Sequence, residues 1–421
     1  MTAEIAILNR TAIALAADSA VTISVSGKTK VYDTAEKLFE LSKRQPIAIM
    51  IYNNVEYVGV PLDVIIRKFR QEKDAAKVVY ERMEDVCSQF VSYLCDFPHD
   101  ISEQKRHLYS ILRDEFRYIA DNVRDRVLRS IDDWLKDPAS SRVKPSEVLM
   151  ELIKATTKTE AARPLDGFLA SVTLTQFRAK FSDVVRRAAA EVFTASDLDA
   201  ATKRELDKLA FALVKSDRGS DLRTGLVFGG FAKADMFPTL RYMEIDGIYF
   251  DELKILSTNE IDIDRKRTRA AVVPFAQKEM VERFMFGLDS ELEGEIRSFV
   301  RSVAHDVVEV AATSLDQAAA AAIRRKVNDQ FKSLVDKLKE SSRQDLLDIV
   351  YFMSKKELAD IAHALVELTS QKRRFSTDDE TVGGPIDVAI ITKNEGLIWI
   401  QRKHYFNSDI NGGFVARTRS N

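Results

Sequence analysis

The sequence predicts an α+β fold in which strand segments far apart in the chain enclose a large helical insertion. Three observations predict this class. The first fifty residues contain short apolar runs separated by turn residues, and strand-like runs return at 224–245 and 386–402. Between them, residues 54–216 have helical periodicity almost throughout. Because strands and helices come in separate runs, we expect layered sheets and helices rather than alternating βαβ units.

Two hairpins and two further strands are expected at the amino terminus. Asn9-Arg10 and Ser26-Gly27 each separate a pair of short runs, which is the pattern of a tight hairpin. Six segments are expected to be strands: 3–8, 11–17, 20–25, 28–32, 38–41 and 47–52. Further along, Asp246-Gly247 is expected to end the strand at 239–245 as a hairpin turn. A last hairpin is expected from 386–392 and 397–402.

Apolar spacing and capping residues mark the helices. Apolar residues recur at about 3.6-residue intervals over 101–135, and three prolines divide the later part of the insertion into shorter helices. More helix is expected from about 276 to 374. Its last member begins at Ser354, which forms a capping-box pattern with Glu357.

Composition indicates a globular protein and excludes several classes. Of 421 residues, 45% are hydrophobic and 30% charged, and the formal net charge of −2 provides no bulk field for nucleic acid or an anionic membrane. Cys87 and Cys95 form neither a disulfide framework nor a CxxC motif. With no signal-peptide pattern and no membrane-length apolar run, a cytoplasmic protein is expected.

No cofactor and no metal are expected. The five histidines have no metal-ligand spacing. Ser26-Gly27-Lys28-Thr29 imitates the end of a phosphate-binding loop, but Thr22 stands where that loop needs its first glycine. We interpret the segment as a turn, so any ATPase would have to be a separate protein.

Thr2 is the first candidate for chemistry. Removal of Met1 before a small residue would make Thr2 the amino terminus, and an amino-terminal threonine combines a hydroxyl nucleophile with an amine base. The α-amino pKa of about 7.7–8.0 suits a base at neutral pH. Asp18 ends the second expected strand, so the first hairpin would return it beside Thr2. Lys37 precedes the next strand, and its ammonium, oriented by Asp18, would lower the pKa of the hydroxyl and the amine.

These residues resemble the opening of proteasome β subunits and the bacterial HslV-type peptidase. The matching elements are Thr2, the string Leu15-Ala16-Ala17-Asp18, Thr22 and the segment from Glu36 to Leu41. The resemblance implies an N-terminal-nucleophile hydrolase fold, an αββα sandwich of two antiparallel sheets. It implies that Thr2, Asp18 and Lys37 are catalytic and that Thr22 contacts substrate.

Further positions are assigned through the same resemblance. Asn53, in place of the family's Ala-Gly, would donate its backbone N–H to the oxyanion. Asp379 matches the aspartate of the family's Asp-x-x-Ser-Gly-Gly pattern and would order the base and the water, although Val382 replaces the serine. Gln277 stands near the position of another assisting serine.

The resemblance also divides the chain. Residues 1–72 and 222–405 would form the core, with extra helices at about 290–350. Residues 75–220 would be the helical insertion and 406–421 a polar tail. The implied function is threonine-dependent hydrolysis of amide bonds in peptides or proteins. Implied partners are further copies of the chain and a separate ATPase or regulator.

Two alternatives stay open. In one, the sandwich is catalytically inactive and serves as a binding or scaffold protein whose helical insertion is the partner surface. Val382 and the altered segment around Asn53 favour that interpretation. In the other, the substrate is a small amide, because a fold does not choose its substrate.

Overall fold

The computed structural model describes residues 2–25, 28–139, 141–194, 198–310, 317–375, 383–404 and 410–413. Fourteen strands are assigned in this part of the chain. They are β1 (Ala3–Asn9), β2 (Ile13–Ala17), β3 (Val21–Val25), β4 (Lys28–Tyr32), β5 (Leu38–Ser42), β6 (Ile47–Asn53), β7 (Glu56–Tyr57), β8 (Val60–Pro61), β9 (Thr224–Gly230), β10 (Thr239–Tyr249), β11 (Glu252–Asp262), β12 (Ala270–Ala276), β13 (Asp387–Thr392) and β14 (Gly396–Gln401).

Ten helices accompany them within the same described ranges. They are α1 (Leu62–Ala75), α2 (Met83–Cys95), α3 (Ile101–Lys136), α4 (Pro145–Ala161), α5 (Leu174–Val192), α6 (Ala200–Lys215), α7 (Glu279–Phe286), α8 (Ser290–Val310), α9 (Gln317–Phe352) and α10 (Lys355–Arg374). The mixed α and β composition predicted from the sequence is confirmed. Its assignment as an N-terminal-nucleophile sandwich stays a prediction.

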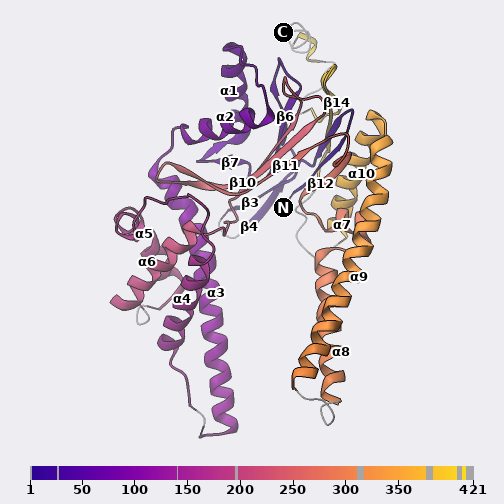
Figure 1. Cartoon of the computed structure of the whole chain (residues 1–421). Helices are drawn as coiled ribbons and strands as arrows, with labels where there is room; N and C mark the ends of the chain where they lie inside the picture. Colours follow the sequence, from indigo (N-terminus) through magenta and orange to yellow (C-terminus); the bar gives the residue numbers. More distant parts are fainter. Residues whose placement is uncertain are drawn as a thin grey trace.

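Two five-stranded antiparallel sheets form the centre of the molecule. One has the strand order β12-β1-β2-β13-β14, and the other has the order β11-β10-β9-β6-β5. Strands from both ends of the chain therefore lie side by side in the first sheet (Figure 1).

Alternation along β1 explains how the first sheet is covered on both faces. Ile5 and Ile7 belong to a buried cluster with α10, whereas Ala6 and Leu8 belong to a cluster shared with the second sheet. Successive side chains of a strand point to opposite faces, so an uninterrupted apolar strand is buried on both. On its outer face, the second sheet packs against α1 and α2. The layers are therefore helix, sheet, sheet and helix.

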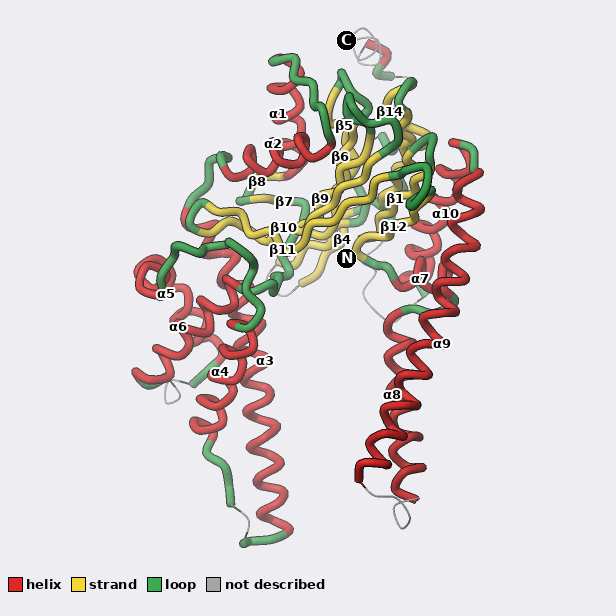
Figure 2. The backbone as a smooth tube through the Cα atoms, in the orientation of Figure 1, coloured by secondary structure: helices red, strands yellow, loops and turns green. Residues whose placement is uncertain are grey.

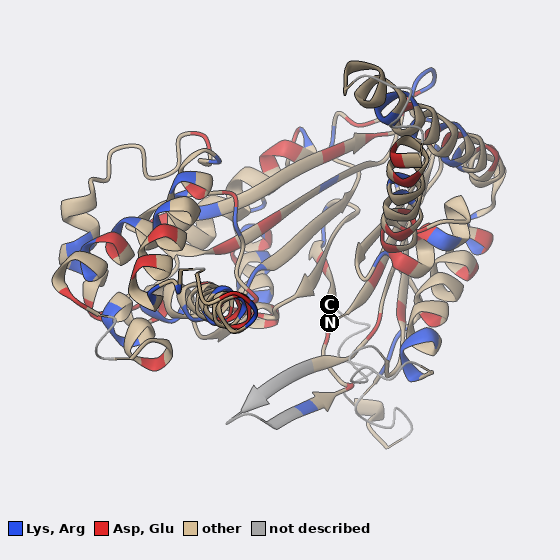
Figure 3. Ribbon diagram, turned by 90° about the horizontal axis from the view of Figure 1, so that it is seen from below, with Lys and Arg blue, Asp and Glu red and all other residues tan. Residues whose placement is uncertain are grey.

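The remaining helices extend beyond these layers. Helices α3 to α6 pack on one another around a phenylalanine-rich core. The α8–α9 hairpin lies on the other side, and both groups extend away from the sheets in the same general direction (Figures 1 and 2). Acidic and basic residues are interspersed along these helices, as expected for the near-zero net charge (Figure 3). No described helix contains an apolar stretch long enough to cross a membrane.

One predicted turn is wrong. Strand β10 continues through Asp246 and Gly247, where the register with β11 is irregular. Gly247 has φ 77°, and a Cβ atom there would come within 2.8 Å of the His107 ring. The reversal lies instead at Phe250 and Asp251, with φ of 51° and 64°, because a two-residue hairpin needs positive φ at both central positions.

Candidate active site

Thr2 lies at the entrance to β1, between the two sheets. It precedes Ala3, and it has the same parity along the strand as Ala6, whose side chain packs between the sheets. Its backbone carbonyl accepts a hydrogen bond from the N–H of Gln277 at 3.3 Å. Only 2% of Thr2 is exposed, so its hydroxyl is held by protein groups rather than by bulk water.

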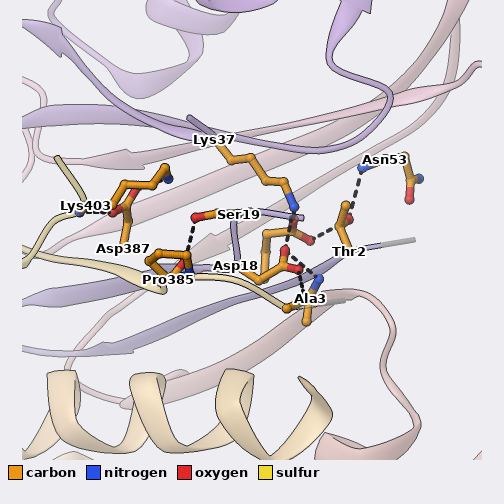
Figure 4. A network of polar contacts seen from close by, with 11 residues as sticks. Thr2, Ala3, Asp18, Ser19, Lys37, Asn53, Pro385, Asp387 and Lys403 are labelled. Atoms are coloured by element: carbon orange, nitrogen blue, oxygen red, sulfur yellow. Dashed lines mark hydrogen bonds and ion pairs between the residues drawn. The ribbon is translucent and has the colours of Figure 1, made fainter. Parts of the chain in front are cut away.

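Two groups bind the Thr2 hydroxyl. It donates a hydrogen bond to Oε2 of Glu4 at 3.1 Å, and it accepts one from the backbone N–H of Asn53 at 3.3 Å. Figure 4 shows Thr2 directed toward Asn53 across the space between the strands. The hydroxyl oxygen is therefore next to a backbone donor.

Asn53 occupies a special backbone conformation at the end of β6. Its φ is 65°, in the left-handed region that asparagine tolerates better than most residues. The structure thus accommodates the absence of a glycine at this position. The amide that the sequence assigned to the oxyanion contacts the Thr2 hydroxyl, and the oxyanion role itself stays a prediction.

Asp18 and Lys37 form a buried ion pair. Nζ of Lys37 lies 2.5 Å from Oδ1 of Asp18, and neither side chain has any exposed surface. Asp18 also accepts hydrogen bonds from the N–H groups of Ala3 at 3.2 Å and Gly383 at 3.0 Å. The β1–β2 register, which pairs Glu4 with Ala17, returns Asp18 to the start of β1. An ordinary surface pair is excluded.

Glu4 is the site residue that sequence reasoning missed. Its Oε1 lies 3.2 Å from Nζ of Lys37, so this ammonium is shared by two buried carboxylates. Burial raises the pKa of Glu4 to about 8, although Lys37 opposes the shift. A signal existed in the sequence: within an apolar strand, Glu4 alternates with the apolar residues Ala3 and Ile5, on the same face as Thr2.

The segment that leads into β13 contacts the residues that follow β2. The carbonyl of Gly383 accepts a hydrogen bond from the N–H of Ser19 at 3.2 Å. The Ser19 hydroxyl donates to the carbonyl of Pro385. Nearby, Asp387 accepts hydrogen bonds from the backbone N–H of Lys403 at 2.8 Å and from its ammonium at 2.5 Å (Figure 4).

The remaining predicted positions are placed less directly. Gln277 approaches Thr2 through its backbone, while its side-chain oxygen accepts a hydrogen bond from Nε of Arg373 at 2.8 Å. Thr22 lies in β3, opposite Val31 of β4. Asp379 and Val382 lie outside the described residues. Among the residues that the structure describes, no three His, Cys, Asp or Glu side chains are grouped as metal ligands would be.

Comparison with known proteins gives few similarities. No family model matches the sequence, and no curated protein matches it. One similar solved structure is Anbu from Hyphomicrobium sp. strain MC1, with 11% identity and a TM-score of 0.25. The similarity covers 99% of this chain and 95% of that chain.

The predicted membership of the proteasome β-subunit and HslV-type peptidase family is therefore wrong. The short motifs around Thr2, Asp18 and Lys37 carried that prediction, but no family model matches the chain as a whole. Residue roles that rest only on the resemblance, such as those of Thr22 and Asp379, have no support from the comparisons. The contacts of the buried residues around Thr2 stand independently of any family.

Proposed function

We propose that this protein hydrolyses amide bonds, with Thr2 as the nucleophile once Met1 has been removed. The observation that carries the proposal is the setting of the Thr2 hydroxyl. It lies 3.3 Å from a backbone N–H and beside a fully buried pair of Asp18 and Lys37. Acyl transfer uses a hydroxyl nucleophile and a backbone donor for the oxyanion, and a nearby ammonium favours loss of the hydroxyl proton.

The reaction would proceed through an ester of Thr2. Its oxygen attacks the substrate carbonyl, and in the mechanism that the sequence predicts the α-amino group freed by loss of Met1 accepts the proton. The N–H of Asn53, which lies 3.3 Å from the Thr2 hydroxyl oxygen, would donate to the substrate oxygen that becomes negative. The leaving amine takes the proton, and water then hydrolyses the ester. Ordering of that water by Asp379, a role first assigned through the family resemblance, is part of the proposal.

This chemistry defines the bond that is cleaved, an amide, and leaves a choice between two classes of substrate. We propose peptides or proteins as substrates, with small amides as the other class that the same groups could serve. Contact of Thr22 and Gln277 with the substrate is part of the proposal. The proposal also includes assembly with further copies of the chain and action together with a separate ATPase or regulator.

Covalent labelling tests the proposal. The intact mass of the purified protein establishes whether Met1 is removed. A β-lactone, which acylates reactive hydroxyls, is then added, and the modified residue is found by peptide mass spectrometry. We expect acylation of Thr2 in the wild type and none in Thr2→Ala. Thr159→Ala, on the exposed surface of α4, is the matched control and should label as the wild type does.

A binding function without catalysis is the second candidate. In this candidate the helical insertion is the partner surface, and its helix α3 has the exposed apolar side chains Tyr118, Leu128 and Leu135. A folded wild type that leaves Thr2 unmodified would support this candidate and contradict the hydrolase.

A further inference from the structure

We propose that Glu4 is the proton acceptor for the Thr2 hydroxyl, so that the nucleophile is activated whether or not Met1 has been removed. This inference rests on the proposed function, because it concerns the same nucleophile. It changes the source of the base from the amino terminus to a side chain within β1.

The geometry places the carboxylate where a base must be. Oε2 of Glu4 is 3.1 Å from the Thr2 oxygen, within the range for direct proton transfer, and it receives the hydroxyl proton in a hydrogen bond. Thr2 directly precedes β1 and Glu4 is the second residue of that strand, so their side chains are directed to the same face of the sheet. Each residue is 2% exposed, which leaves little room for water to compete for this proton.

The second oxygen of Glu4 is held in place. Within the described part of the chain Oε1 accepts no hydrogen bond of regular geometry, but it lies 3.2 Å from the Lys37 ammonium. Lys37 is fixed in turn by Asp18, whose oxygens also bind the N–H groups of Ala3 and Gly383. The order of contacts is therefore Asp18, Lys37, Glu4 and Thr2. Lys37 contacts the carboxylate that binds the hydroxyl, so its charge acts on Thr2 through Glu4.

The protonation of Glu4 suits this role. Burial raises its pKa to about 8, and a base works best when its pKa is near the working pH. The titratable groups that influence it are Lys37, which lowers the pKa, and Asp18, which raises it. Tyr52 of β6 also lies near Glu4, whose charge contributes to raising the pKa of Tyr52. The Tyr52 hydroxyl donates a hydrogen bond to Glu244. In the amino-terminal mechanism, by contrast, a retained Met1 would leave no free amine at Thr2.

The proton balance of the step is simple. The Thr2 oxygen forms a bond to the substrate carbonyl carbon, its proton moves to Oε2 of Glu4, and the carbonyl electron pair moves to the oxygen. As the C–N bond breaks, the carboxyl group returns the proton to the leaving nitrogen. Water then attacks the ester, again giving a proton to Glu4, and this proton passes to the Thr2 oxygen as the acid leaves.

The experiment compares two forms of the full-length protein. One is produced with methionine aminopeptidase inhibited, so that Met1 is retained, and the other is allowed to lose Met1; intact mass verifies each. Both react with a β-lactone between pH 5 and 9, and the rate of Thr2 acylation is followed by mass spectrometry. We expect rates in the two forms to agree within about 10-fold. In both, Glu4→Gln should lower the rate by about 100-fold or more.

Controls separate this inference from a folding defect and from the proposed function. Glu340→Gln, exposed on α9, should leave the rate unchanged. Thermal unfolding checks that Glu4→Gln folds. If it does not fold, the pH dependence of Thr2 acylation in the wild type with retained Met1 tests the inference instead. A rate that rises to a plateau near pH 8 supports the inference, and a flat profile overturns it.

Three outcomes are decisive. Acylation confined to the form without Met1 overturns the inference and leaves the proposed function standing. Unchanged acylation in a folded Glu4→Gln protein also overturns the inference and leaves the proposed function standing. If Thr2 is acylated in neither form of the wild type, the proposed function fails, and the inference fails with it.

Discussion

Nζ of Lys37 lies 2.5 Å from Oδ1 of Asp18, and both side chains are completely buried, each next to a strand of a different sheet. Asp18 follows β2 of the first sheet, and Lys37 precedes β5 of the second. The pair therefore joins the two sheets at the place where Thr2 enters the fold. A buried charge without its partner is costly, so each member depends on the other.

Asp18→Asn should destabilise the protein by about 3 kcal/mol. The variant leaves Lys37 with Glu4 as its remaining acidic partner and directs an amide toward groups that donate hydrogen bonds. Urea unfolding measures the change. Asp360→Asn is the control, because Asp360 forms an exposed helical pair with Lys356, worth at most about 0.5 kcal/mol. An equal loss of unfolding free energy in the two variants would contradict the claim that the buried ion pair matters more than an exposed one.

Stability should fall as the pH rises from about 4.5 to about 8 because of Glu4. Its pKa in the folded protein is about 8, against an ordinary value of 4.5, so the folded state holds a proton that the unfolded chain has released. Removing that proton therefore destabilises the folded state over this window. Glu4→Gln cannot titrate and should reduce the pH dependence. Urea midpoints at pH 5 and pH 8.5 test this, and parallel behaviour of variant and wild type would refute it.

Asn53→Gly should fold as well as the wild type, to within about 0.5 kcal/mol, and should keep Thr2 reactive. Glycine adopts φ of 65° without strain and retains the backbone N–H that contacts Thr2. Asn53→Val should cost about 1–2 kcal/mol, because a branched residue is strained in this region. Chemical denaturation and β-lactone labelling of both variants provide the comparison. Loss of labelling in a stable Asn53→Gly protein would mean that the asparagine side chain itself is required.

The amino-terminal sheet was predictable because its sequence signals are local. The run 3–8 corresponds to β1, and 47–52 corresponds to β6, each a nearly unbroken apolar segment. Strands β11 and β12 were not predicted, for two different reasons. Much of β11 is exposed and charged at the edge of its sheet, and β12 contains Pro274, which is tolerated because β12 is also an edge strand.

The candidate site was predictable only in part. Residue types and hairpin spacing brought Thr2, Asp18 and Lys37 into one hypothesis, because a tight hairpin returns the end of β2 to the start of β1. Glu4 was missed because its importance depends on the second sheet. Lys37 reaches Glu4 only through packing between sheets, which no local pattern reveals.

Gly384→Ala should destabilise the protein by about 2 kcal/mol or more. Its φ is 74°, and an added Cβ would lie 2.7 Å from Cβ and 2.9 Å from the carbonyl oxygen of Asp33, so backbone would have to move. The neighbouring Gly383 donates its N–H to Asp18, and that contact should weaken as the segment shifts. We therefore expect slower β-lactone labelling of Thr2 together with a lower unfolding temperature.

The matched control for Gly384→Ala is Gly294→Ala within α8. No atom lies within 4 Å of a Cβ added at Gly294, and alanine favours a helix over glycine by roughly 0.5–1 kcal/mol. This variant should be as stable as the wild type or more so, with unchanged labelling. If both variants behaved alike, the close approach of Gly384 to Asp33 would not limit that position. A loss confined to Gly384→Ala would instead show that the carboxy-terminal segment must keep its backbone path for Asp18 to stay in place.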